Sequence, residues 1–154
     1  MSTFTTILHP TDFSEAAGPA LRMAYQLARD YSARLVLLNV VEPPVYFGEL
    51  GVGFNAPEEH RSLAEERIAS LLEPDPKVAI EPRVVEGMAA AEIVREARER
   101  QCDLIVICSH GRTGIGRVLM GSVAEEVARK ASCPVLIVRT HHEIAATRAA
   151  HEAG

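Results

Sequence analysis

The stretch that decides the fold of this chain is Ile107-Cys108-Ser109-His110-Gly111, followed nine residues later by Gly121-Ser122. This order predicts the end of a buried β-strand, then a glycine-containing loop, then the start of a helix. Glycine lets the backbone approach an anion closely, and a helix start offers N–H groups without intrahelical partners and the positive end of the helix dipole. The stretch therefore predicts a phosphate-binding loop.

The charge of this loop is opposite in sign to that of the whole chain. Residues 104–124 contain no Asp or Glu, and their formal charges are Arg112 and Arg117, in a chain with a net charge of -5. A basic loop in an acidic protein favours a small anion as the ligand. A purely structural interpretation stays open, because Ser122 and Glu125 have the spacing of a helix capping box and the loop glycines (Gly111, Gly114, Gly116) are ordinary turn residues.

Outward from this stretch, short apolar runs rich in β-branched residues alternate with segments of helical period. Five runs predict strands, at residues 5–9, 34–41, 78–86, 104–108 and 133–139. Four segments repeat apolar residues at helical spacing, starting at Leu21, Ala64, Ala90 and Val123. The alternation predicts an α/β fold, a single doubly wound domain whose five-stranded parallel sheet is covered by helices on both faces.

Length, cysteine content and charge exclude several classes of protein. The 154 residues are enough for one domain without disulfides, and the three cysteines lack C-x-x-C spacing. The N-terminus lacks the basic start of a signal peptide, and no apolar run approaches the roughly 18 residues of a membrane span. With only two lysines and no basic block, the chain is not expected to bind nucleic acid. We therefore expect a cytoplasmic protein without a membrane partner.

Two segments fall outside the alternation of strands and helices. Residues 42–55 form a long loop with prolines, glycines and the aromatic residues Tyr46, Phe47 and Phe54, which predicts a lid over a site or a patch for a partner. Residues 141–154 are a C-terminal tail, expected to be a helical extension or disordered. Its histidines do not form a preformed cage, so we expect no metal site there.

The end of the first predicted strand supplies a second candidate element of the site. It continues into Pro10-Thr11-Asp12-Phe13-Ser14-Glu15. If the first and fourth strands are neighbours, Asp12 lies beside the phosphate loop, because ligands of doubly wound sheets bind at the carboxyl ends of the strands where the strand order reverses. Its carboxylate can accept hydrogen bonds from ribose hydroxyls or an adenine amino group, or hold a metal. Alternatively, Asp12 or Ser14 caps the following helix.

These segments together resemble the universal stress protein family. The resemblance rests on Pro10-Thr11-Asp12-Phe13-Ser14-Glu15, Leu37-Leu38-Asn39-Val40, the glycine loop and Cys133-Pro134-Val135-Leu136-Ile137-Val138, and it covers residues 3–139. It implies one family domain at residues 1–140 and the strand order 3-2-1-4-5. The ATP-binding branch is marked by Gly-x-x-Gly-x9-Gly-Ser/Thr, which is matched here at Gly111, Gly121 and Ser122, whereas Cys108 stands in place of the first glycine.

The resemblance also implies a ligand, a set of site residues and a function. The implied ligand is ATP, and Asp12 could hold Mg²⁺ that is bound to the nucleotide. Asp12 and the Val40 backbone would hold the nucleoside, Ile107 would line the base pocket, and the glycine loop would hold the phosphates. The full predicted site is Pro10, Thr11, Asp12, Val40, Ile107, Cys108, Gly111, Arg112, Gly121, Ser122 and Val123. The function would be that of a dimeric stress-response regulator with an unidentified protein partner. The alternative is a family member that does not bind nucleotides and acts as a dimeric interaction module.

No catalytic residue is predicted. The chain has no G-x-x-x-x-G-K-[ST] loop and no lysine near the phosphate loop. Ser109 and His110 are adjacent in sequence, and neighbouring side chains at a strand end are expected to point apart, which argues against a nucleophile and its base. At most, slow ATP hydrolysis by a bound water is compatible with this site.

The two edges of the predicted sheet differ, and the difference predicts how the protein assembles. The third strand is rich in charge and contains Pro82, features that resist the addition of another strand. The fifth strand is apolar throughout: Val135-Leu136-Ile137-Val138. We therefore expect a homodimer that pairs two copies of this strand about a two-fold axis, as the family resemblance also implies. Alternatively, the C-terminal tail folds back over this edge.

Overall fold

A five-stranded parallel sheet forms the centre of the molecule, with the order β3-β2-β1-β4-β5. The computed structural model describes residues 4–43, 57–72, 75–110, 120–140 and 148–153. The strands are β1 (Thr6–Pro10), β2 (Arg34–Val41), β3 (Ile80–Glu86), β4 (Leu104–Cys108) and β5 (Val135–Val138). The predicted fold class and strand order are confirmed.

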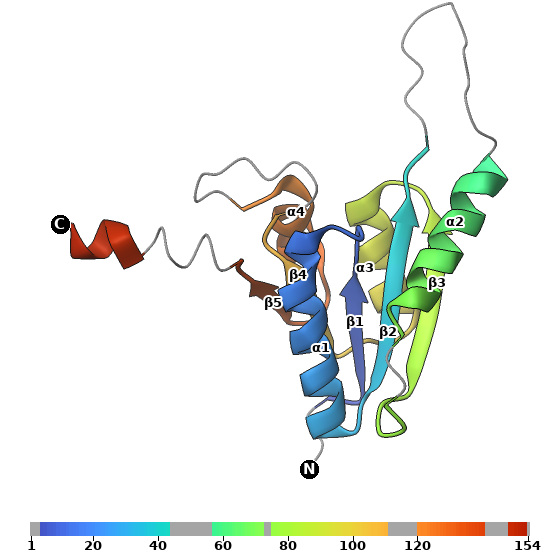
Figure 1. The fold of residues 1–154 in the computed structure, drawn as a ribbon, viewed down its shortest axis with the longest axis horizontal. Coiled ribbons are helices and arrows are strands. Elements are labelled where there is room, and N and C mark those ends of the chain that lie inside the picture. The colour runs from blue at the N-terminus through green and yellow to red at the C-terminus, as the bar shows by residue number, and fades with distance from the viewer. Residues whose placement is uncertain (1–3, 44–56, 73–74, 111–119, 141–147, 154) are drawn as a thin grey trace, which may run out of the picture.

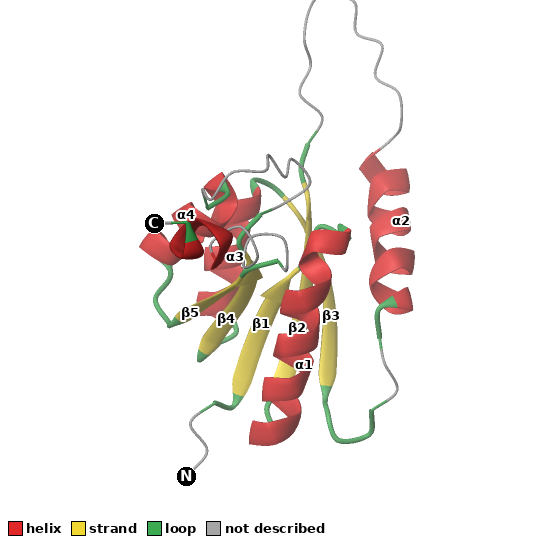
Figure 2. Ribbon diagram, turned by 60° about the vertical axis from the view of Figure 1, so that its left-hand side comes forward, coloured by secondary structure: helices red, strands yellow, loops and turns green. Residues whose placement is uncertain are grey.

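Helices cover both faces of the sheet. They are α1 (Gly18–Tyr31), α2 (Pro57–Ser70), α3 (Ala89–Glu99) and α4 (Ser122–Lys130), and a short 3-10 helix, η1 (Glu15–Ala17), precedes α1. Figures 1 and 2 show α1 and α2 over one face and α3 and α4 over the other. This is the layered arrangement that right-handed strand–helix–strand connections produce.

The central strands are apolar on both faces because both faces are covered. Successive residues of β1 point in opposite directions, so Ile7 packs under α1 while Leu8 packs under α3 and α4, and both are fully buried. The buried residues of helix α1 are all small, namely Ala20, Ala24 and Ala28, while Leu21, Tyr25 and Leu27 pack against the core as partly buried residues. These small residues let the helix backbone lie close to the strands.

The strand order reverses between β1 and β4. The chain passes from β1 to β2 and β3 on one side, then crosses to β4 and β5 on the other. Loops that leave β1 and β4 at their carboxyl ends therefore diverge, and a crevice opens between them. The reversal places the Asp12 segment and the glycine loop at the same edge of the sheet.

The bounds of the strands agree with prediction best in the middle of the sheet. Strands β2 and β4 have the predicted bounds, and β1 is shifted by one residue. The edge strands are shorter than predicted: β3 begins at Ile80 instead of residue 78, and β5 spans Val135–Val138 instead of 133–139. An edge strand has a hydrogen-bonding partner on one side only, so its pairing ends earlier than its apolar sequence does.

Part of the predicted lid and part of the tail lie outside the described residues, namely 44–56 and 141–147. Residues 148–152 are helical, and Figure 1 shows this helix well apart from β5. Leu136 of β5 is 38% exposed. The alternative in which the tail covers this edge is therefore not seen in the described part of the tail. Among the described helices, none is long and apolar enough to span a membrane.

Candidate functional site

A cavity of about 600 Å³ lies at the carboxyl end of the sheet, where the strand order reverses. This volume is in the range of small-molecule sites. Its walls come from the loop after β1, the end of β2, one face of α2, the start of α3, the end of β4 and the start of α4. The structure places nine of the predicted site residues in these walls: Pro10, Thr11, Asp12, Val40, Ile107, Cys108, Gly121, Ser122 and Val123. Gly111 and Arg112 lie outside the described residues.

The loop after β1 is fixed to β2 by backbone and side-chain hydrogen bonds. The Thr11 N–H donates to the Leu38 carbonyl at 2.8 Å, and the Asn39 amide donates to the Thr11 carbonyl at 2.8 Å. Asn39 is buried and also lines the cavity. These bonds hold the loop against the end of β2, so the Asp12 segment has a defined position relative to Val40.

Asp12 closes a local turn. Its Oδ1 atom accepts hydrogen bonds from the Ser14 N–H at 2.9 Å and from the Ser14 hydroxyl at 2.5 Å. Ser14 is the N-cap residue of η1, but its side chain makes no capping hydrogen bond there. The alternative that Asp12 or Ser14 caps helix α1 is wrong, because α1 begins at Gly18 after η1 and its N-cap residue is Ala17. The turn holds the carboxylate at the wall of the cavity.

The start of α4 forms the opposite wall. Gly121 is the N-cap residue of α4 and has extended backbone angles, and the Gly121 N–H donates to the Ser109 carbonyl at 2.7 Å. The capping-box interpretation is wrong, because α4 already begins at Ser122, one residue too early for Ser122 to be the cap, and the N-cap residue Gly121 has no side chain to offer. Among the described residues, the N–H groups of the first turn of α4 therefore lie at the cavity without a side-chain cap.

The Cys108 side chain is turned toward η1. Its thiol donates to the Ala16 carbonyl at 2.9 Å, and the residue packs in the apolar cluster beneath α1. Cys108 also borders the cavity. The residue that replaces a glycine of the family motif is thus anchored to the neighbouring loop.

The side chains of Ser109 and His110 lie closer together than the sequence predicts. The Ser109 Oγ and His110 Nδ1 atoms are 3.3 Å apart, so the prediction that these two side chains point apart is wrong. Ser109 is only 4% exposed, and both residues line the cavity. The loop that follows β4 leaves the extended conformation at this point, which removes the alternation on which the expectation depended.

One wall of the cavity was missed by the sequence analysis. It is the face of α2 formed by His60, Leu63, Ala64 and Arg67. The guanidinium carbon of Arg67 lies 5.5 Å from the centre of the Phe13 ring, and Phe13 also lines the cavity. The signal in the sequence is the spacing of these four residues, which places them on one side of a helix. The spacing does not tell whether that side faces the core or a ligand.

His9 lies beneath the site in β1 and is fully buried. Its Nδ1 atom is 2.8 Å from the Val106 carbonyl, so Nδ1 carries the proton that is donated. Burial lowers the pKa of His9 from 6.5 to about 4, a shift that the Val106 hydrogen bond and the nearby Asp12 charge only partly oppose. The ring is therefore neutral near pH 7, and its Nε2 atom has no hydrogen-bond partner among the described residues.

The described residues contain no cluster of three or more His, Cys, Asp or Glu side chains that could hold a metal by themselves. The carboxylates of the cavity, Asp12 and Glu42, come from two separate elements. A divalent cation at this site would therefore depend on oxygen ligands supplied by a bound molecule.

A doubly wound sheet with a cavity at the reversal of strand order defines a class of α/β proteins that bind small ligands at this position. Comparison with known proteins narrows this class to one family. The sequence profile of the universal stress protein family matches residues 3–139, and the chain belongs to this family.

Curated relatives agree with this assignment. The chain is 34% identical to universal stress protein MJ0531 of Methanocaldococcus jannaschii over 141 residues, which is 88% of this chain and 82% of the relative. It is 30% identical to universal stress protein MJ0577 of the same organism over 155 residues, with 88% of this chain and 95% of the relative covered.

Solved structures show the same fold. The structure of MJ0577 superposes with a TM-score of 0.73 at 28% identity, covering 90% of this chain and 97% of that one. A universal stress protein solved in complex with cAMP superposes with a TM-score of 0.60 at 28% identity, covering 88% of this chain and 97% of that one.

Proposed function

We propose that this protein binds ATP in the cavity at the carboxyl end of the sheet. The observation that carries the proposal is the N-terminus of α4, whose N-cap residue is Gly121 and which no described side chain caps, at a cavity that is also lined by Asp12 and Val40. Open N–H groups and the positive end of the helix dipole favour phosphate. The relative solved with cAMP supports an adenine nucleotide as the ligand class.

Each wall has a role in this proposal. The first turn of α4, from Gly121 to Val123, and the loop residues Gly111 and Arg112 would hold the phosphates. Asp12 would accept hydrogen bonds from the ribose, and the Val40 backbone would pair with the adenine edge. Mg²⁺ bound to the phosphates would find an oxygen ligand in the Asp12 carboxylate, which is the ligand type that Mg²⁺ prefers.

We also propose that the protein acts as a homodimeric regulator of the stress response and not as an enzyme. Strand β5 is the apolar edge of the sheet, and the side chains of Val135, Leu136, Ile137 and Val138 are half-buried or exposed. Pairing with a second copy would cover them. The alternative function is a dimeric interaction module that binds no nucleotide, and Cys108 at the position of a motif glycine favours it.

The absorbance spectrum of the purified protein separates these two functions. The chain has three tyrosines and no tryptophan, so a copurifying nucleotide would dominate the ratio of absorbance at 260 and 280 nm, and mass spectrometry would identify it. Titration calorimetry should then show tighter binding of ATP than of GTP, because the donor and acceptor pattern that the Val40 backbone meets on adenine is reversed on guanine. Equal affinity for both nucleotides would contradict the role of Val40.

Substitutions in the first turn of α4 test the phosphate site. We expect Gly121→Val to abolish ATP binding without loss of fold, because the added side chain enters the cavity wall. Ser122→Ala should weaken binding by about 1 kcal/mol, the value of one lost hydrogen bond. Gly18→Val is the control at the start of α1, where an added Cβ meets only the Arg22 side chain at 3.4 Å. Normal ATP binding by Gly121→Val would overturn the proposal.

A further inference from the structure

We propose that Arg67 and Phe13 together form the wall against which the base of the bound nucleotide stacks. The guanidinium lies over the Phe13 ring, with 5.5 Å between its central carbon and the ring centre, and both residues line the cavity. A guanidinium that covers a ring with one face offers its other planar face to a second ring. The inference rests on the proposed function and deepens it by naming a residue that positions the base.

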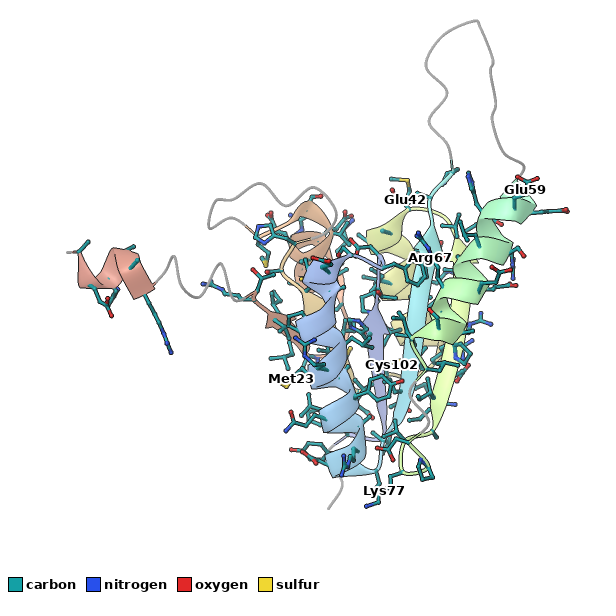
Figure 3. The ribbon with its side chains drawn as sticks, viewed as in Figure 1. Met23, Glu42, Glu59, Arg67, Lys77 and Cys102 are labelled. Atoms are coloured by element: carbon teal, nitrogen blue, oxygen red, sulfur yellow. The ribbon has the colours of Figure 1, made fainter. Side chains whose placement is uncertain are left out.

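The position of Arg67 in the fold places it at the base end of the cavity. Helix α2 packs on β2 and β3, whereas α4 packs beside β5. In the strand order β3-β2-β1-β4-β5 these helices are on opposite sides of the crevice. Figure 3 labels Arg67 between α2 and the carboxyl end of β2. Arg67 is therefore on the β2 side of the cavity, the side from which the Val40 backbone would pair with adenine, and across the cavity from the proposed phosphate site.

The backbone of Phe13 is held in an unfavourable conformation. Its φ angle is +64°, in the left-handed region that an aromatic residue rarely adopts. Three local hydrogen bonds support this turn: Phe13 N–H to Thr11 Oγ1 at 3.1 Å, and the two bonds from Ser14 to Asp12. Strain that the surroundings maintain is typical of functional loops. Here it turns the ring toward α2, where the ring packs near Ala64 and meets Arg67.

The charge of Arg67 is available to a ligand. Arg67 forms no ion pair with another described residue, whereas Arg61, two turns earlier on the same helix, pairs with Glu65 at 3.1 Å. Arg67 is also the one lysine or arginine among the described residues of the cavity wall. Arg67 is exposed and lines the cavity, so a stacked base would cover part of its side chain.

Titration calorimetry with ATP on a set of variants tests this inference. We expect Arg67→Ala to weaken ATP binding about tenfold, the order of magnitude of one lost stacking contact with a base. Arg67→Lys keeps the charge but not the planar group, so it should bind within about twofold of Arg67→Ala. Phe13→Leu should also weaken binding, because the guanidinium loses the ring that orients it. Arg61→Ala is the control, with the same change of charge on the same helix outside this cavity.

Adenosine serves as a second ligand, because it has the base but no phosphate. The same loss of affinity for adenosine and for ATP is expected in Arg67→Ala. Unchanged ATP binding by Arg67→Ala overturns the inference and leaves the proposed function intact. Two other results would also overturn it: wild-type affinity for ATP in Arg67→Lys, or an Arg67→Ala variant that loses affinity for ATP but not for adenosine. In either case Arg67 would act on the phosphates through its charge. A wild-type protein that binds no ATP overturns the proposed function as well.

Discussion

At the scale of single residues, Cys108 is the position where this chain departs from the family's glycine motif. Cys108 borders the cavity, but its thiol is turned toward η1 and donates to the Ala16 carbonyl. Under the proposed function, this side chain would stabilise the fold and leave room for the ligand. Glycine at this position would lose both the hydrogen bond and the packing under α1.

The first prediction follows from this geometry. Cys108→Gly should lower the free energy of unfolding by about 1–2 kcal/mol, through the lost contacts and the added freedom of the unfolded chain. Its affinity for ATP should equal or exceed that of the wild type. Denaturant unfolding and calorimetry measure the two effects separately. A much weaker affinity of Cys108→Gly for ATP would show that the thiol contributes to the site. Cys133→Ala, at the other end of the sheet, is the control.

His9 predicts how the stability of the fold depends on pH. Its pKa is about 4 in the folded protein and 6.5 in the unfolded chain, so between these values the unfolded chain binds more protons. The free energy of unfolding should therefore fall as pH decreases from 6.5 toward 4, by up to about 3 kcal/mol from this residue. Above pH 6.5 the contribution is fully present, and below pH 4 it declines no further.

Urea unfolding measured across this pH window checks the second prediction. Carboxylates also titrate on the acid side, so the informative quantity is the difference in slope between the wild type and His9→Leu. The slope should be flatter in His9→Leu. His151→Leu, in the exposed helix at the C-terminus, is the control and should keep the slope of the wild type. Equal slopes in all three proteins would contradict a neutral buried His9.

At the scale of elements, an ion-pair network surrounds one buried carboxylate of α3, that of Glu96. The Glu96 side chain is 2% exposed and lies 2.7 Å from Arg100, 3.4 Å from Arg83 and 3.6 Å from Arg95. Arg100 also pairs with Glu81 of β3. The network joins α3 to the edge strand β3 and surrounds its central carboxylate with cations.

The third prediction concerns this central carboxylate. Glu96→Gln should lower the free energy of unfolding by about 1–3 kcal/mol, because three arginines lose the charge that they share. The cost stays below that of a fully buried pair, since the arginines are partly exposed and can turn to water. Glu99→Gln is the matched control: Glu99 also pairs with Arg95, but its side chain is 54% exposed, so its loss should cost less than about 0.5 kcal/mol. Similar costs for both variants would contradict the network.

The sequence predicted elements well where burial alone determines them. The predominantly apolar runs of β2 and β4 are both largely buried, and their bounds agree with the prediction. The ends of β3 and β5 depend on where a neighbouring strand stops, which local sequence does not specify. The contact of Arg67 with Phe13 joins residues from α2 and the loop after β1, and the Ser109–His110 approach depends on the loop backbone. Such contacts arise only from the assembled fold.

At the scale of the whole molecule, the fourth prediction is a homodimer. Light scattering at micromolar concentration should give twice the monomer mass of 16.7 kDa. Ile137→Lys should produce a monomer, because a charge would be buried at the pairing edge. Leu136→Lys should do the same, and because Leu136 is 38% exposed this substitution leaves the core intact.

The opposite edge of the sheet offers a matched control. Pro82→Lys introduces the same charge at an exposed position of β3 and should leave the dimer unchanged. A wild-type protein that remains a monomer would reject the assembly. Loss of the dimer in Pro82→Lys as well would place the interface elsewhere.

The unlike edges of the sheet also limit how far association can proceed. Strand β3 contains Pro82 between two charged residues, Glu81 and Arg83, which form ion pairs with Arg100 and Glu96. Strand β5 contains apolar side chains only. Each chain therefore offers a single edge to which another strand could be added. A chain with two such edges could extend into a fibre, whereas the proposed pairing would use up the apolar edge of both partners. In the proposed dimer, association would therefore stop at two copies, even at high protein concentration.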